Sequence, residues 1–246
     1  MPSISSRHLA LIAVLAAVYA MASMLPGIPV VGGGGKGKIE LAAFLGPVYG
    51  MLIGPFTGFA AAWLGAFVGW VLPPGASGPW GLATTLCPAT AALVSGLAVT
   101  HRVSKVRGWI LASAVLAALI AGWYLTAVGR IAYWYPVLHW AGLAVLLTTG
   151  RWLPKLYDGR KSMPAAAVLA GYAGIVSDHM VGNLLFISLG GPLLGAPTSP
   201  EKLASIFKGV LLLSAVERAT MLLLLAIIGV PVMYAVRASG VLKLRR

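Results

Sequence analysis

Acidic residues are scarce in this sequence. Asp and Glu together number 5 in 246 residues, charged residues of both signs make up only 9% of the chain, and Cys87 is the single cysteine. Soluble domains normally carry about 25% charged residues, so this composition excludes an ordinary soluble protein. The lone cysteine excludes an internal disulfide and any CxxC redox or zinc motif.

Apolar residues take the place of the missing charges. They form 59% of the chain, and the mean hydropathy is +0.93. A membrane-spanning helix needs about 20 apolar residues. We therefore predict one all-α polytopic transmembrane domain over residues 1–246, with about eight membrane segments. They lie at roughly 9–25, 39–53, 55–72, 82–100, 109–128, 131–150, 164–190 and 206–235. The second is short, and we expect it to be tilted or re-entrant.

The net charge of +13 is unevenly distributed along the chain. If the N-terminus lies inside, one side of the membrane receives twelve of the eighteen basic residues. They are Arg7, Arg102, Lys105, Arg107, Arg151, Lys155, Arg160, Lys161, Arg237, Lys243, Arg245 and Arg246. The positive-inside rule then predicts a multi-pass protein of the plasma membrane with both termini cytoplasmic. The excess charge is explained by topology and affinity for anionic lipid, so no nucleic-acid partner is expected.

The N-terminal segment allows two interpretations. Arg7, the apolar run that follows it and Ala20-Met21-Ala22 resemble a cleavable signal peptide. An uncleaved first helix is the alternative. We favour the uncleaved helix, because the basic loops fall on the cytoplasmic side only when this helix is counted as the first membrane segment.

Small residues crowd the first three segments. The first carries Ala13, Ala16, Ala17 and Ala20, and glycines fill the stretch 39–72. Lipid gives helices no hydrophobic reason to associate, so small residues at four-residue spacing let helix backbones approach and pack. The pattern predicts a compact helical core with one small-residue surface free for a partner.

Ionisable residues within the apolar segments are the sharpest functional signal, because such groups are costly in a bilayer and usually face a partner or a cavity. Asp178 and His179 lie near the middle of the segment 164–190, and Asn183 shares a helix face with His179. We expect these three residues to line a polar pocket. Glu217 and Arg218 lie near the middle of the last segment. A structural role is the alternative, in which Asp178 or Glu217 forms an intramembrane charge pair with Arg218 that ties two helices together.

Two further candidates lie toward the expected outer face. Glu40 opens the second segment, where its carboxylate is suited to binding a cationic group or lies solvated beside Lys36 and Lys38. Trp80 lies in an expected outer loop, as a stacking surface for a flat ligand or as an interface anchor. The nearby stretch 32–38 nearly matches a P-loop, but Ile follows its lysine where Ser or Thr is required. We therefore expect no ATP hydrolysis by a P-loop in this chain.

The segments between 109 and 150 are expected to form an inserted helical hairpin. It begins and ends at basic loops, so deleting it would leave the orientation of every other segment unchanged. The aromatic residues near its outer tip are interpreted as an interfacial belt rather than a ligand-binding box. They are Tyr133, Trp134, Tyr135 and Trp140.

The opening pattern resembles a known family, the substrate-binding S components of energy-coupling factor transporters. The first-helix alanines, the glycine-rich loop 32–38 and the Gly-Pro-studded segments 39–53 and 55–72 carry the resemblance. It covers about the first 100 residues well and continues more loosely through 164–235. The family usually has six helices, so the hairpin 109–150 is an addition to a six-helix S-component-like core.

The resemblance implies a function. S components capture a small molecule, often a vitamin, in a pocket open to the outside. They then dock on a transmembrane coupling subunit whose two separate ATPase subunits supply the energy. The resemblance implies a docking face formed by Ala13, Ala16, Ala17 and Ala20, and ordinary intramolecular packing is the alternative for these alanines. The residues that we expect to bind the substrate are the polar and aromatic candidates above, Glu40, Trp80, Asp178, His179 and Asn183. The substrate that best suits tryptophans and sparse polar groups is a flat heterocycle.

Two other classes of protein remain as alternatives. A self-sufficient ion-coupled carrier would use Asp178 and Glu217 as proton sites. A rhomboid-like intramembrane protease would use the serine of the stretch 75–78 with His179 as its base. The prolines around that serine and the lack of the earlier His-and-Asn helix disfavour the protease. We expect no enzyme activity and no cofactor. We also expect no metal site, because no HxH or CxxC spacing is present.

Overall fold

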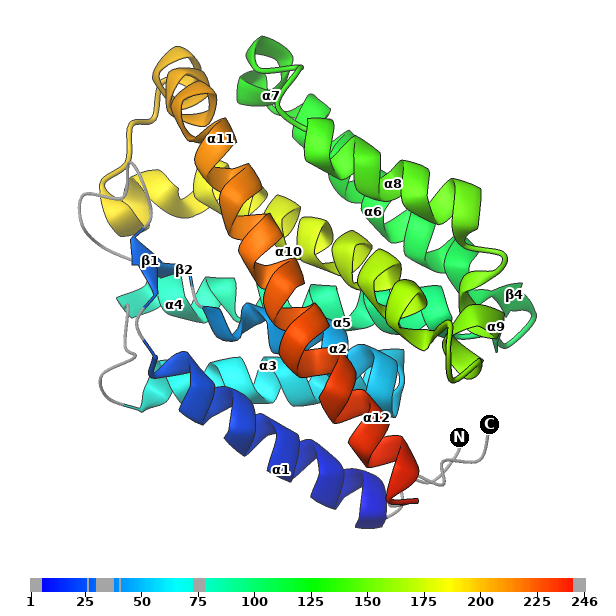
Figure 1. Ribbon diagram of the computed structural model, residues 1–246. Helices are drawn as coiled ribbons and strands as arrows, with labels where there is room; N and C mark the ends of the chain where they lie inside the picture. Colours follow the sequence, from blue (N-terminus) through cyan, green and yellow to red (C-terminus); the bar gives the residue numbers. More distant parts are fainter. Residues whose placement is uncertain (1–5, 26, 30–37, 40, 73–77, 241–246) are drawn as a thin grey trace.

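A computed structural model describes residues 6–25, 27–29, 38–39, 41–72 and 78–240, and these residues are almost entirely helical (Figure 1). The helices are α1 Ser6–Ser23, α2 Leu45–Ile53, α3 Pro55–Val71, α4 Gly78–Thr84, α5 Leu86–Val99, α6 Gly108–Leu125, α7 Ala127–Ile131, α8 Val137–Thr149, α9 Leu153–Asp158, α10 Met163–Leu194, α11 Pro200–Leu224 and α12 Val230–Ala238. A 3₁₀ turn, η1 Leu41–Phe44, precedes α2, and a π turn, η2 Leu225–Gly229, joins α11 to α12. Two short antiparallel ladders pair β1 Ile28–Pro29 with β2 Lys38–Ile39, and β3 Arg102–Val103 with β4 Val106–Arg107.

Four helical stretches among the described residues are long and apolar enough to cross a membrane, and they are Gly78–Val99, Gly108–Leu125, Met163–Leu194 and Pro200–Ala238. Four shorter apolar helices accompany them, at His8–Ser23, Ala42–Ile53, Pro55–Val71 and Val137–Thr149. Apolar helices of this length satisfy their own backbone hydrogen bonds, which lipid cannot do. The chain is therefore an all-α membrane protein, as the composition predicts.

The N-terminal half is held together by helices that touch backbone to backbone. A Cβ added at Gly50 in α2 would overlap the carbonyl of Ala92 in α5, and one at Gly58 in α3 would lie 2.6 Å from the Gly50 Cα. A Cβ at Gly65 would lie 2.8 Å from the carbonyl oxygen of Ala16 in α1. These close approaches require glycine, and they join α1, α2, α3 and α5 in the manner expected of small residues in lipid.

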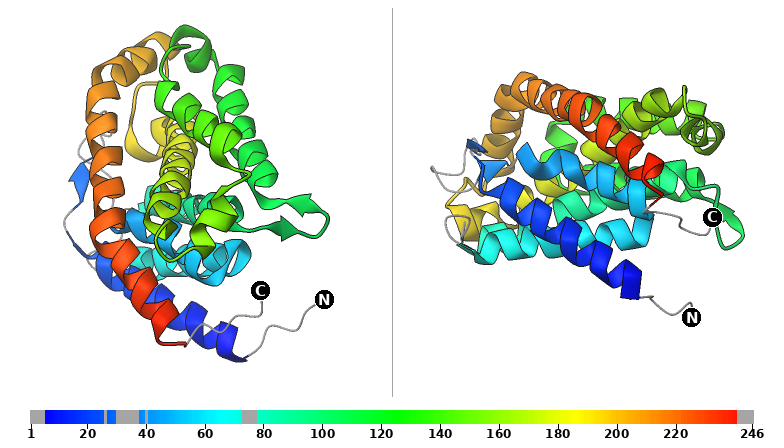
Figure 2. Two further views of the ribbon diagram at one scale, coloured as in Figure 1. Left: turned by 45° about the vertical axis from the view of Figure 1, so that its right-hand side comes forward. Right: turned by 60° about the horizontal axis from the view of Figure 1, so that its bottom comes forward.

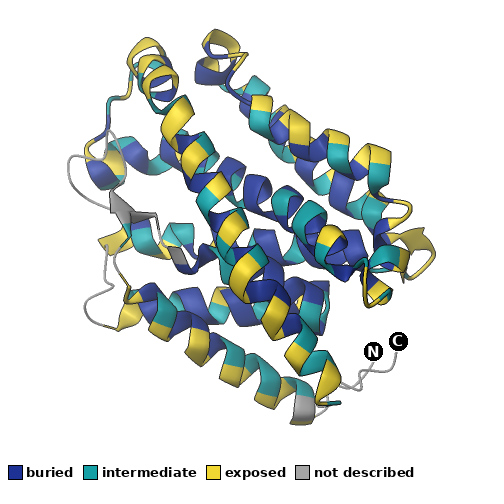
Figure 3. Ribbon diagram, viewed as in Figure 1, coloured by how far each residue is buried: buried dark blue, intermediate teal, exposed yellow. Residues whose placement is uncertain are grey.

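Helix α10 occupies the centre of the molecule. Figures 1 and 3 show it between the α1–α3–α5 group and the hairpin formed by α6 and α8, with most of its middle buried. Gly174 of α10 packs against α5, because a Cβ there would meet the Ala91 carbonyl at 2.7 Å. On the opposite side, Gly142 of α8 lies against Val176 of α10. The buried polar side chains of α10, Ser177, His179 and Asn183, therefore face protein rather than lipid.

The last helical run crosses the others on the outside of the bundle (Figure 2). It extends from Pro200 to Ala238, longer at both ends than the segment 206–235 expected from hydropathy. Ser199 caps its start by accepting a hydrogen bond from the Lys202 amide at 3.3 Å. Its π turn lies against the core, because Leu225 is fully buried and contacts Gly171 of α10. Such π turns occur frequently at functional sites.

The basic loops gather at one end of the bundle, which we call the basic end and define as residues 100–107 and 150–162. Tyr157 of α9 donates a hydrogen bond to the carbonyl of Met51 at 2.8 Å, and Arg237 of α12 donates to the carbonyl of Tyr157 at 2.7 Å. His101 lies 2.9 Å from the Asp158 carboxylate. These contacts bring loops that are distant in sequence together near the described ends of the chain (Figure 1).

Candidate functional site

A polar cluster is buried where the hairpin meets α10 and α11. The rings of His139 in α8 and His179 in α10 stack with centroids 5.1 Å apart and an interplanar angle of 19°. The hydroxyl of Tyr135, just before α8, lies 3.4 Å from His179 Nε2 and 3.4 Å from the hydroxyl of Ser214 in α11. Three helical segments far apart in sequence thus meet through polar side chains.

A charged pair completes this cluster on α11. Arg218 donates from Nη2 to Oε2 of Glu217 at 3.0 Å, and both side chains are 5% exposed or less. Glu217 and Arg218 are consecutive residues of α11, so this ion pair does not tie two helices together. It therefore differs from the structural role that the sequence suggests as an alternative. The charge of Arg218 acts electrostatically on both imidazole rings and on Tyr135. An uncompensated charge buried here would be costly, and Glu217 offsets that cost.

Some polar atoms of the cluster have no hydrogen-bond partner within the described residues. They are Nδ1 of His179 and Nε of Arg218, whereas His139 lies near the backbone of Pro136 and Asn183 lies beside the Tyr135 hydroxyl, both without good hydrogen-bond geometry. A buried polar group without a partner costs about 1–3 kcal/mol in proteins. The amide and guanidinium nitrogens can only donate. The cluster therefore offers a surplus of donors, which suits a ligand carrying carbonyl, carboxylate or ring-nitrogen acceptors.

Aromatic side chains surround the cluster. Tyr135 stacks on Trp123 of α6 with centroids 5.0 Å apart, and Phe207 of α11 meets both rings edge-on at 4.9 and 4.8 Å. Phe186 of α10 continues this group toward Trp80 of α4. A site with aromatic walls and a few polar groups is the usual composition of small-molecule pockets.

The structure brings together only some of the residues expected to bind substrate. His179 and Asn183 are both buried on the same side of α10, and the Asn183 side chain lies beside the Tyr135 hydroxyl. Asp178, their neighbour in sequence, is only half-buried. Glu40 lies outside the described residues. The serine of the protease alternative, Ser77, also lies outside them.

Trp80 does not lie in a loop, which was the expectation from its Gly-Pro surroundings. It belongs to α4, is 4% exposed and packs edge-on against Phe186 at 6.1 Å. The physical reason is that Gly78 adopts a positive φ of 60° and Pro79 follows it in the first helical turn. Proline at the start of a helix is favourable because its missing N–H has no partner there in any case.

The alanines of α1 divide into two faces. Ala16 and Ala20 are 3% exposed and face α3, where Gly65 and Gly69 receive them. Ala13 and Ala17 are exposed on the opposite side. This outer face is otherwise apolar, with Leu9, Val14, Val18 and Met21 exposed along it. Only Ala13 and Ala17 are therefore available to a partner.

Sequence reasoning missed Tyr135, His139 and Ser214. Tyr135 was interpreted as part of an interfacial belt with Tyr133, Trp134 and Trp140, and the structure corrects this for Tyr135 alone. It is 1% exposed, whereas the exposed fractions of the other three range from 36% to 67%. A signal was present, because Tyr135 and His139 are four residues apart, at the spacing that places two residues on one helix face, and His139 is ionisable within an apolar segment.

The described residues contain no group of three His, Cys, Asp or Glu side chains arranged to hold a metal ion. The stacked imidazoles supply two nitrogen ligands at most, and Glu217 is engaged by Arg218. Structural metal sites ordinarily need four ligands and catalytic zinc sites need three. The cluster thus has fewer candidate metal ligands than such sites need.

Comparison with known proteins finds an archaeal relative. No family model matches the sequence, and no solved structure matches it. The chain is similar to the uncharacterized protein MJ0923 of Methanocaldococcus jannaschii, with 30% identity over 156 residues. The matched part is 63% of this chain and 50% of that protein, so the chain spans about half the length of the curated relative. The name of the relative assigns no substrate.

Proposed function

We propose that the protein is a membrane-embedded capture subunit for the uptake of a small molecule. It binds its substrate at the buried polar cluster and delivers it by docking on a membrane coupling subunit that separate ATPases drive. The proposed arrangement is a six-helix core extended by the α6–α8 hairpin, in the plasma membrane, with both termini cytoplasmic. The observation that carries the proposal is the cluster itself, with unpartnered donors inside aromatic walls.

The location of the cluster supports binding rather than simple packing. A purely structural polar cluster would satisfy its own hydrogen bonds, since a half-satisfied network is less stable than an apolar core. Here Nδ1 of His179 and Nε of Arg218 are buried without a partner, and the polar neighbours of His139 and Asn183 are not in good hydrogen-bond geometry. A substrate with acceptor groups would form hydrogen bonds with these atoms, and each hydrogen bond would add to its binding free energy.

The side chains of the cluster touch each other, so the substrate needs an opening. The hairpin α6–α8 contributes Tyr135 and His139, whereas α10 and α11 contribute the rest. A shift of the hairpin would separate the two stacked imidazoles without breaking the glycine-mediated contacts of α1, α2, α3 and α5. We assign the hairpin the role of a moving wall on a rigid support.

The outer face of α1 supports docking. Exposed apolar residues there surround Ala13 and Ala17, which carry the smallest apolar side chains, so a second helix can approach the backbone closely. A helix face that met only lipid would gain nothing from small residues. The absence of acidic residues from α1 also leaves this face compatible with burial in the bilayer.

An ion-coupled carrier is the second candidate, and a specific observation favours it. Glu217 is buried in the bilayer region beside Arg218 and near two histidines, and intramembrane ionisable groups of this kind form proton relays in pumps and transporters. In that case the chain alone would transport substrate in response to a proton gradient. The substrate-capture subunit would instead bind substrate but be unable to transport it alone.

Co-purification in mild detergent separates the two candidates. The capture-subunit proposal predicts that the tagged chain brings down a membrane subunit and two ATPases. Ala17→Trp should abolish their recovery, because an indole on the outer face of α1 holds a docked helix away. Leu212→Trp is the matched control, since Leu212 is 78% exposed on α11, away from α1. A chain that purifies alone and transports after reconstitution would establish the carrier instead.

A further inference from the structure

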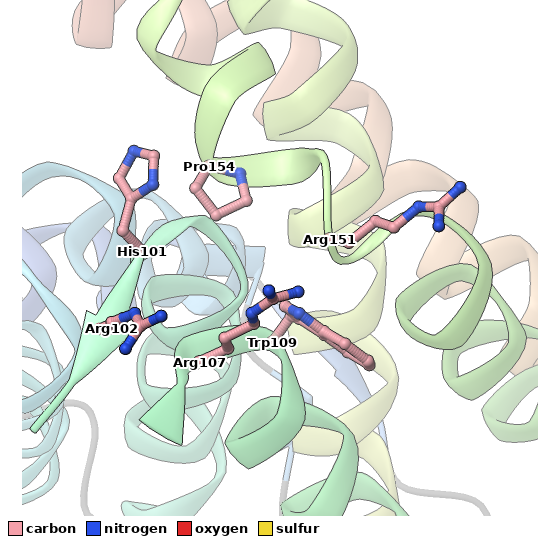
Figure 4. A pocket seen from close by; sticks show the side chains of 6 residues that line it. All are labelled: His101, Arg102, Arg107, Trp109, Arg151 and Pro154. Carbon is pink, nitrogen blue, oxygen red and sulfur yellow. The ribbon is translucent and has the colours of Figure 1, made fainter. Parts of the chain in front are cut away.

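A second polar feature, unrelated to the buried cluster, lies at the basic end. It is an open cavity of about 510 Å³, lined by His101, Arg102, Arg107, Trp109, Arg151 and Pro154 (Figure 4). Three arginines line it, and no acidic residue does. We call it the basic pocket. Pockets of about 300–1,000 Å³ accommodate small ligands or headgroups.

The β3–β4 hairpin forces two of these arginines together. Arg102 and Arg107 are direct cross-strand partners in the antiparallel ladder. A two-residue loop holds this register, with Ser104 in the left-handed region at φ 55°. Like charges placed directly opposite on paired strands destabilise each other. Within the described residues neither guanidinium forms an ion pair with a carboxylate, so an anion between them would relieve the repulsion.

The start of α6 adds donors to the same place. Trp109 lies in the first turn of the helix, and its indole Nε1 is buried without a hydrogen-bond partner among the described residues. The N-terminus of α6 has no side-chain cap, and its first amide, that of Gly108, donates to a backbone acceptor outside the helix, the His101 carbonyl at 3.4 Å. Unpartnered N–H groups at a helix N-terminus, together with the helix dipole, attract anions and phosphate groups. The pocket thus combines two arginines, an indole donor and a helix N-terminus.

The other lining residues are less directly involved. His101 Nε2 lies 2.9 Å from Oδ2 of Asp158, an acidic residue near the basic pocket. The Asp158 carboxylate is therefore engaged by His101. Arg151 lies over the ring of Trp152 at 3.8 Å, and Figure 4 shows its guanidinium directed away from the other lining side chains. Its charge contributes to the field of the pocket, but its donors are not aimed into it.

The position of the pocket indicates where its ligand comes from. It lies at the first turn of α6, a helix long and apolar enough to span the membrane, so it is at the depth of the lipid headgroups. Trp152 is 46% exposed beside it, as expected for a tryptophan at the membrane interface. Basic pockets between helices at this depth bind anionic lipid headgroups.

We propose that the basic pocket binds the phosphate of an anionic phospholipid, which anchors the α6–α8 hairpin to the leaflet at the basic end. Arg102 and Arg107 contact the phosphate oxygens, and Trp109 Nε1 donates to one of them. The acyl chains then follow the exposed apolar surface of α6, where Ile110 is 43% exposed. The lipid site is independent of the substrate cluster and of the docking face.

Native mass spectrometry with added lipid tests this proposal. The purified protein is titrated with phosphatidylglycerol and, separately, with zwitterionic phosphatidylcholine. We expect selective retention of phosphatidylglycerol, and a loss of affinity on the order of 10-fold in Arg102→Gln/Arg107→Gln. Trp109→Phe keeps the ring and removes only the N–H, and should lose several-fold. Lys155→Gln/Lys161→Gln is the matched control, because it removes equal charge from the basic end outside the pocket.

The outcomes are distinct. Equal losses in the two double variants would show general attraction to a positive surface and overturn the proposal. Inorganic phosphate and pyrophosphate form a separate arm. If they bind in an Arg102- and Arg107-dependent manner while phosphatidylglycerol does not, the pocket serves a soluble phosphate and the lipid proposal is wrong. Retention of phosphatidylcholine as strong as that of phosphatidylglycerol would also overturn it.

Discussion

The imidazole rings of His139 and His179 lie face to face in the middle of the protein, 5.1 Å apart. His139 belongs to the α6–α8 hairpin, which is the addition to the proposed six-helix core. His179 belongs to the central helix α10, which carries buried polar groups of the cluster. The contact therefore joins the hairpin to α10. Both rings are within the electrostatic influence of Arg218. This relationship places the hairpin within the proposed binding site.

The buried ion pair gives the first prediction. Replacing either partner leaves the other as an uncompensated buried polar or charged group, which costs about 3–5 kcal/mol for a buried pair. We expect Glu217→Gln and Arg218→Gln each to lower the melting temperature in detergent strongly. The double variant should cost much less than the sum of the two. Additive effects in this double-mutant cycle would contradict the pairing.

The two faces of α1 give the second prediction. Ala16→Trp should prevent folding, because the Ala16 backbone already contacts Gly65 of α3. Ala17→Trp should leave the melting temperature nearly unchanged, because Ala17 is exposed. Size-exclusion profiles and thermal unfolding in detergent measure both. If Ala17→Trp also unfolded the protein, its outer face would belong to the intramolecular core and could not serve docking.

The glycine contacts give the third prediction. Gly50→Ala should destabilise the protein, since the new Cβ overlaps backbone of α5 that cannot rotate away. Gly209→Ala is the matched control, because no atom lies within 4 Å of its Cβ position in α11. Removing a helical glycine at an open site should stabilise by roughly 0.5–1 kcal/mol. Equal melting temperatures for the two variants would refute the close α2–α5 packing.

Topology gives the fourth prediction. In a Cys87→Ser background, single cysteines at Lys105 and Arg160 of the basic end should react only with reagents that enter the cell. Cysteines at Arg130 and Lys202, on the opposite end of the bundle, should react from outside. The charge asymmetry is the physical reason. Labelling of positions 105 and 160 from outside would reverse the proposed orientation.

The packing of the N-terminal half was predictable from the sequence, and the site was predictable only in part. Small residues at four-residue spacing directly indicate where backbones approach, and Gly50, Gly58 and Gly65 behave as that pattern implies. His179 and Asn183 were found because polar groups inside apolar segments are costly. Both local signals can be read without knowing which helices are neighbours.

The contribution of the hairpin was not predictable in the same way. Tyr135 resembled its exposed neighbours in sequence, and only the packing of the hairpin on α10 and α11 distinguishes it from Tyr133 and Trp134. Apolar helices in lipid carry no strong periodic pattern that shows which face is inside, since both faces are hydrophobic. Long-range neighbours of this kind follow from the fold rather than from any local pattern.

Ligand binding by cluster variants tests the central claim most directly. The wild-type protein and the variants His179→Ala and Asn183→Ala are purified in detergent and titrated against a panel of vitamins by isothermal calorimetry, with melting temperatures recorded in parallel. A binding site predicts that each variant loses about 1–3 kcal/mol of binding free energy, with a nearly unchanged melting temperature. Unchanged dissociation constants for both variants, with lowered melting temperatures, would show that the cluster only holds the helices together and would contradict the proposed site.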